Sequence, residues 1–99
     1  ISMKFSIQQL PFITLWKNTN SEGEGYVTGL EPGTNFPNNR RIERKFGRVP
    51  KLDSGQSHHA EIDFTILKGN KAVGGLIDQI QKIQRRAQPV IETKPENKD

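Results

Sequence analysis

The sequence predicts a mainly β protein, an incomplete antiparallel β-sandwich followed by one C-terminal α-helix. Apolar and polar residues alternate at 3–7 and again at 58–67, the period of a strand with one covered face. Over 70–88 the apolar residues instead follow steps of three and four, as in an amphipathic helix. Only 31% of the 99 residues are hydrophobic, which is little for a self-sufficient sandwich. We therefore expect the sheets to be completed by a missing N-terminal portion of the same protein or by another chain.

Four strands are predicted along the chain. Residues 3–7 form the first strand, and 12–17 form a second one that is apolar on both faces apart from a threonine. Residues 18–25 consist of turn-forming types, so a hairpin or longer loop should lead to a third strand at 26–31. Residues 32–57, rich in Pro, Gly, Asn and Arg, are expected to be a long irregular connection, and such loops are often functional.

The C-terminal third contains the last strand and the helix. Residues 58–67 give the clearest alternation, and Asn70 is placed to cap the helix that follows. The organisation is thus 1–69 for the sandwich strands, 70–88 for the helix and 89–99 for a charged tail that we expect to be disordered. The apolar stripe of the helix should pack on the sandwich or on a neighbouring chain.

Composition excludes several classes of protein. The absence of Cys excludes a disulfide scaffold, a zinc ribbon and a thiol nucleophile. No apolar run is long enough for a membrane span and no signal-peptide pattern occurs, so we expect a soluble, cytoplasmic protein without a membrane partner. The net charge of +4 permits an anionic partner without requiring one.

Glu31 is the first candidate for catalysis. It stands at the end of a predicted apolar strand, where Pro32 and Gly33 turn the chain into the long loop. A carboxylate held by a strand and open to a ligand suits a general base. The alternative is an ordinary solvated carboxylate at a strand end.

Short motifs in order along the chain carry a family resemblance. They are Leu-Trp-Lys at 15–17, Gly-Leu-Glu-Pro-Gly at 29–33, Asn-Phe-Pro-Asn at 35–38 and Leu-Asp-Ser-Gly-Gln at 52–56. Together they resemble the C-terminal end of the galactose mutarotase (aldose 1-epimerase) superfamily, and within it the epimerase-like subfamily. The resemblance covers 5–67 and leaves out the predicted helix.

The resemblance implies a galactose mutarotase-like supersandwich, a large antiparallel β-sandwich that binds a sugar on its concave face. Glu31 would remove the proton from the anomeric hydroxyl of an aldose, free or phosphorylated, while a histidine protonates the ring oxygen. No cofactor is implied. His58 and His59 do not stand where the family has its catalytic histidines, so the acid is expected upstream and the chain alone is expected to be inactive.

Aromatic and polar residues near Glu31 are candidates for holding the sugar. Phe36 and Trp16 offer flat rings that can stack on a pyranose, and Asn35, Arg40 and Arg41 can contact hydroxyl groups or an anion. The alternative for Trp16 is a place in the core, because its strand is apolar on both faces.

The segment 40–51 is strongly basic, with Glu43 as its only acid. It could be a solvated loop, recognise an anionic sugar, or bind a nucleic-acid backbone. We expect nucleic acid not to be the partner, because the net charge is modest and no nucleic-acid-binding fingerprint is present. A sugar-binding module without catalysis is a further alternative.

A metal site is not expected. His59, Glu61 and Asp63 share one face of the predicted fourth strand, but successive residues on a face lie about 6.5–7 Å apart, which is too far to share one ion. A solvated outer face is the simpler interpretation.

Overall fold

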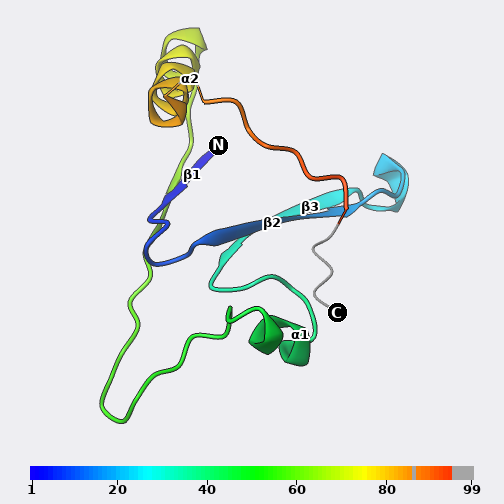
Figure 1. Cartoon of the computed structure of the whole chain (residues 1–99). Coiled ribbons are helices and arrows are strands. Elements are labelled where there is room, and N and C mark those ends of the chain that lie inside the picture. The colour runs from blue at the N-terminus through cyan, green and yellow to red at the C-terminus, as the bar shows by residue number, and fades with distance from the viewer. Residues whose placement is uncertain (86, 95–99) are drawn as a thin grey trace. The chain divides into compact units, whose positions relative to one another are not determined.

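The computed structural model describes residues 1–85 and 87–94 and is drawn in Figure 1. Its elements are β1 (Ser2–Phe5), β2 (Phe12–Asn18), the short 3-10 helix η1 (Glu22–Glu24), β3 (Val27–Gly33), α1 (Arg40–Lys45), β4 (Ile62–Thr65) and α2 (Asn70–Gln84). The strands form two antiparallel two-stranded sheets, β1 with β4 and β2 with β3. The prediction of a mainly β chain with one main helix is confirmed, whereas the sandwich stays a prediction.

The chain divides into two compact units. One comprises Lys4–Asp63, and the other Ile1–Met3 together with Phe64–Asp99. The first contains β2, β3 and α1, and therefore every residue singled out as a candidate for catalysis or sugar binding.

The hairpin of β2 and β3 is the longest paired element. Its register runs from Phe12 opposite Gly33 to Asn18 opposite Val27, and the two strands lie side by side in Figure 1. The connection closes where the Asn18 side-chain amide donates to the Gly25 carbonyl oxygen over 3.3 Å. Gly25 adopts a φ of 93°, a backbone conformation that favours glycine. The turn-rich composition of this connection thus produces the expected hairpin.

Side chains alternate between the two faces of the hairpin. Directly paired residues share a face, so Thr14 and Glu31 lie together on one face. Ile13, Leu15 and Leu30 occupy the opposite face, and each is about half exposed. The sequence predicts β2 to be covered on both sides, but the described residues do not bury these apolar side chains.

Two buried side chains stand out among the described residues. Leu10 is only 8% exposed, and it follows a turn in which its amide N–H donates to the Ser6 carbonyl oxygen over 2.9 Å. Glu43 is completely buried, although it is charged. A carboxylate rather than a hydrophobic side chain is therefore the most enclosed group described.

α1 corrects the sequence prediction. Residues 32–57 were expected to be irregular, but 40–45 form a helical turn and a half. Asn39 caps it by accepting a hydrogen bond from the Arg41 amide over 2.9 Å, and Gly47 follows its end with a φ of 68°. β3 also extends through Pro32 to Gly33, two residues further than expected.

β4 is shorter than the predicted strand 58–67, because it begins at Ile62 and ends at Thr65. The histidines at 58 and 59 therefore precede the strand. The predicted alternation of faces therefore applies only to the central residues of the predicted strand, those that form β4.

α2 begins at Asn70, but Gly69 is the N-cap and the structure gives no side-chain hydrogen bond there. The prediction that Asn70 caps the helix is wrong by one position. The helix ends at Gln84, before the expected 88, and Arg85 terminates it with a left-handed φ of 49°. Its apolar stripe is exposed along its length, at Val73, Ile77, Ile80 and Ile83.

The predicted tail, 89–99, falls partly outside the described residues. Its part up to residue 94 has no helix or strand, and 95–99 lie beyond what the structure describes. Among the helices of the described residues, none has the length and apolar character needed to cross a membrane.

Candidate functional site

Glu31 projects from β3 on the same face as Thr14, its partner across the hairpin. Its side chain lies back over Gly29, two residues earlier on that face. A Cβ atom added to Gly29 would stand 2.8 Å from the Glu31 Oε1 atom, closer than real Cβ contacts. The Gly-Leu-Glu motif therefore has a local reason, because the glycine leaves room for the carboxylate.

A shallow hollow of about 210 Å³ adjoins this carboxylate. Its walls are formed by Thr14, Glu31, Pro32, Gly33, Asn35, Phe36 and Pro37. The hollow is smaller than the ~300–1,000 Å³ of pockets for drug-sized ligands, so it fits part of a small ligand. The structure thus brings together Glu31, Asn35 and Phe36, which the sequence proposed for base and sugar contacts.

Trp16 lies on the same face of the hairpin without lining the hollow. It pairs with Gly29 across the strands and is 51% exposed. It is a diagonal neighbour of Glu31, a relation that separates backbones by about 7–8 Å and lies within reach of a large side chain.

Arg40 and Arg41 belong to α1 and are exposed, and neither lines the hollow. They share the short helix with Arg44 and Lys45, which are also exposed. The basic segment is therefore organised by a helix rather than spread along a loop. The predicted roles of Arg40 and Arg41 stay predictions.

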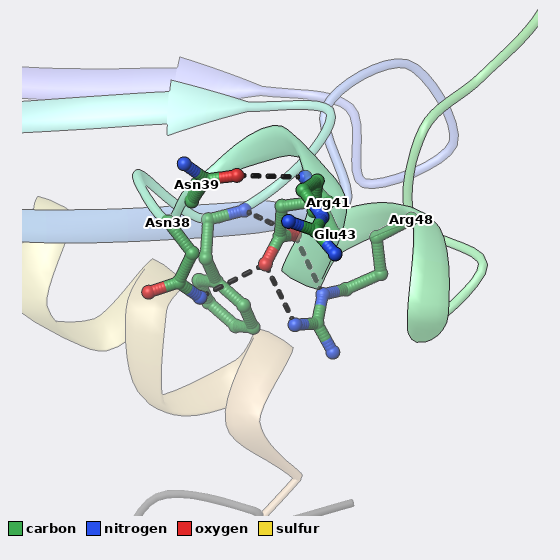
Figure 2. Close-up of polar contacts among 6 residues, drawn as sticks. Asn38, Asn39, Arg41, Glu43 and Arg48 are labelled. Atoms are coloured by element: carbon green, nitrogen blue, oxygen red, sulfur yellow. Dashed lines mark hydrogen bonds and ion pairs between the residues drawn. The ribbon is translucent and has the colours of Figure 1, made fainter.

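Among the described residues, the polar cluster with the most side-chain hydrogen bonds centres on the buried Glu43. Its Oε1 atom accepts hydrogen bonds from the Asn38 side-chain amide and from Arg48 Nη2, each over 2.8 Å. Its Oε2 atom accepts from Arg48 Nε over 2.8 Å and from the Phe36 amide N–H over 3.2 Å. Figure 2 shows the side chains of Asn38 and Arg48 reaching this carboxylate from opposite sides. We call Asn38, Glu43 and Arg48 the carboxylate clamp.

The clamp keeps Glu43 ionised. The pKa of Glu43 is lowered from 4.5 to about 2, and the hydrogen bonds from the Arg48 side chain are the largest cause. Burial acts in the opposite direction, while the bonds from Asn38 and the Phe36 amide and the charge of Arg48 add to the lowering. Two parallel N–H donors from one guanidinium match both oxygens of a carboxylate, which is why arginine suits this position.

Aromatic rings surround the arginine of the clamp. The guanidinium carbon of Arg48 lies 5.0 Å from the centroid of the Phe36 ring and 4.2 Å from that of Phe46, within the range of cation–π contacts. The Phe36 ring also packs against Phe12 of β2, with centroids 4.6 Å apart and planes tilted by 51°. The clamp thereby connects the loop after β3 to the hairpin.

Sequence reasoning missed the clamp, although signals for part of it were present. Asn39 before a run of helix-forming residues and Gly47 after it are start and stop signals for a helix. Glu43 is also the only acid in the basic segment 40–51. A single acid among several cations is expected to pair with one of the arginines, but no local pattern indicates that this arginine is Arg48.

Neither His58 nor His59 lines the hollow. Both are exposed, and His59 Nε2 is 3.8 Å from the Glu61 Oε2 atom, near the surface. Within residues 1–85 and 87–94, no group of three His, Cys, Asp or Glu side chains could hold a metal ion.

The chain was compared with protein-family models, with curated proteins and with solved structures. The model of the family described as "Domain of unknown function (DUF4432)" matches residues 1–66. Neither the curated proteins nor the solved structures include a match. The matched segment contains the hairpin, the hollow beside Glu31 and the carboxylate clamp, and it ends before α2. Because it covers 66 of the 99 residues, the chain belongs to the DUF4432 family.

Proposed function

We propose that the hollow beside Glu31 binds a carbohydrate and that Glu31 is the general base of an enzyme that interconverts the anomers of an aldose. The observation that supports this most is the meeting of Glu31, Asn35 and Phe36 around one hollow. The sequence motifs at these positions resemble those of aldose 1-epimerases. The positions of the three side chains around the hollow are consistent with that chemistry.

The three side chains supply complementary contacts for a sugar. The exposed Glu31 carboxylate can accept the proton of the anomeric hydroxyl. The Asn35 amide can donate to one hydroxyl group and accept from another. Phe36, 36% exposed, can cover an apolar face of the ring, with Trp16 as a second aromatic surface on the same side of the hairpin.

The reaction also needs an acid at the ring oxygen. In the proposed mechanism a histidine from the remainder of the protein protonates that oxygen while Glu31 takes the hydroxyl proton. The ring opens to the aldehyde, rotation about the bond between C1 and C2 exchanges the faces, and closure returns both protons and gives the other anomer. No cofactor enters this cycle.

Completion of the fold belongs to the same proposal. Ile13, Leu15 and Leu30 leave one face of the hairpin about half exposed, which a second layer of sheet would cover. We propose that further strands, from the same protein or another chain, complete a galactose mutarotase-like sandwich around it.

The test is the exchange of α and β anomers of D-glucose and D-galactose, measured by exchange NMR or polarimetry with the full-length protein. Glu31→Gln should abolish turnover and leave sugar binding, because the amide keeps the shape and cannot take the proton. The matched control is Glu22→Gln, an exposed carboxylate in η1. Turnover that survives Glu31→Gln would refute the role of Glu31. Binding by the wild-type protein without turnover would favour a non-catalytic sugar-binding module.

A further inference from the structure

We propose that Glu43 and Arg48 are positioning residues, which hold the ring of Phe36 at the hollow beside Glu31 so that it can receive a ligand. For the identity of that ligand the inference rests on the proposed function. The way in which the ring is held is a separate claim and can be tested without any sugar.

The pair holds Phe36 at both its main chain and its side chain. The Phe36 amide donates to Glu43 Oε2 over 3.2 Å, and the Arg48 guanidinium carbon lies 5.0 Å from the Phe36 ring centroid. Because Glu43 and Arg48 are joined by two hydrogen bonds of 2.8 Å, these two attachments are fixed relative to each other. A residue in an open loop acquires in this way one defined orientation.

The burial of the pair makes this attachment stiff. The Glu43 side chain is fully buried and that of Arg48 is only 15% exposed. Asn38 occupies a further acceptor site of the carboxylate, and the Phe46 ring lies 4.2 Å from the guanidinium carbon. Neither long side chain can therefore change its rotamer without losing several contacts at once.

Phe36 belongs to the loop after β3, and the carboxylate clamp holds it against the hairpin of β2 and β3. Its ring packs on Phe12 of β2 and lines the hollow with Glu31. Glu31 itself is held by the pairing of β3 with β2 and makes no use of the clamp. The clamp should thus determine the affinity for a ligand, and the pairing of β2 with β3 should determine the position of the Glu31 carboxylate.

The experiment compares Arg48→Lys and Glu43→Gln with Arg44→Lys in the full-length protein. Lysine keeps the charge of Arg48 but lacks the two-pronged donor geometry, and glutamine keeps the shape of Glu43 but loses its charge. Arg44 is an exposed arginine of the same helix and serves as the matched control. One readout is the nuclear Overhauser effect between the Phe12 and Phe36 rings. The other is the Kd for D-glucose and D-galactose, with KM and kcat where anomer exchange is measurable.

We expect both clamp variants to weaken the Phe12–Phe36 cross-peaks, while cross-peaks between Thr14 and Glu31 persist. The Kd or KM should rise about tenfold, the equivalent of losing one aromatic contact, and kcat should change little. Arg44→Lys should leave every readout at its wild-type value. If Arg48→Lys does not fold, Asn38→Ala, which removes a single contact to Oε1, is judged by the same criteria.

Unchanged ring cross-peaks in both clamp variants would overturn the inference, and so would lost cross-peaks with unchanged sugar affinity. A fall in kcat with constant KM would also overturn it, because the clamp would then act on the base. Wild-type protein that binds neither sugar would refute the proposed function instead, and the ring cross-peaks would still decide whether the clamp positions Phe36.

Discussion

Removal of the guanidinium beside Glu43 should raise the pKa of that carboxyl. Arg48 supplies the largest lowering contribution, through hydrogen bonds of 2.8 Å to both carboxylate oxygens, and it holds the pKa at about 2 against an ordinary value of 4.5. Arg48→Met keeps an unbranched apolar side chain but no donor and no charge. With that contribution gone and burial still favouring the neutral acid, we expect the pKa to rise from about 2 towards its ordinary value of 4.5, although the hydrogen bonds from Asn38 and the Phe36 amide still lower it.

The same shift predicts how stability depends on pH. The pKa of Glu43 is lower in the folded chain than in the unfolded one, so its contribution is complete above about pH 4.5 and is lost as the pH falls towards 2. Inside that window unfolding takes up a proton at Glu43, and the folding equilibrium weakens by up to about tenfold per pH unit. Arg48→Met should largely remove this dependence on acid, at the expense of lower stability near neutral pH.

The assay is the ¹³C chemical shift of the Glu43 carboxyl carbon followed from pH 7 to pH 2, together with urea unfolding at several pH values. A wild-type titration midpoint near 4.5 would refute the reasoning, since the clamp would then not stabilise the charged form. So would a midpoint that does not rise in Arg48→Met.

Three further results are expected. Gly29→Ala places a methyl group 2.8 Å from the present position of the Glu31 Oε1 atom, so the carboxylate should swing away and anomer exchange should fall at least tenfold; wild-type exchange rates would contradict this. Gly47→Ala should cost about 1–2 kcal/mol in urea unfolding because its φ is 68°, and Gly23→Ala, at a site with no positive φ and open space, serves as the control. Binding of a single-stranded oligonucleotide should show no steep salt dependence; a large slope of log Kobs against log salt, removed by neutralising α1, would favour nucleic acid as the partner.

The strands could be located from the sequence because their signals are local. Alternation gave β1 and β4, and the turn residues between 18 and 25 gave the hairpin of β2 and β3. The ends of these elements were less well placed, since β4 loses residues at both ends and Gly69 caps α2. End positions depend on single hydrogen bonds and on backbone conformation, which a periodic pattern does not encode.

The candidate site could be predicted in part. Glu31, Asn35 and Phe36 are close in sequence, so a strand end and a tight loop suffice to bring them to one hollow. The clamp could not be deduced in this way. The clamp forms only if a helical turn buries Glu43 and the chain then reverses at Gly47, so that Arg48 returns to the carboxylate. Each of these features depends on the other, so neither can be read from a local pattern in the sequence.

The carboxylate clamp also changes the interpretation of the basic segment. A count of charges treats its cations as equivalent, but Arg48 is neutralised by Glu43 and enclosed by rings, while the arginines of α1 are exposed. The exposed cations carry whatever attraction the segment has for anions, and the enclosed one shapes the loop that faces Glu31. Substitutions in the two sets should therefore have different effects on binding. The effect of substitutions in α1 should depend on the salt concentration, because it comes from charge alone. The effect of substitutions at Arg48 should be the same at any salt concentration, because it comes from the geometry of Phe36.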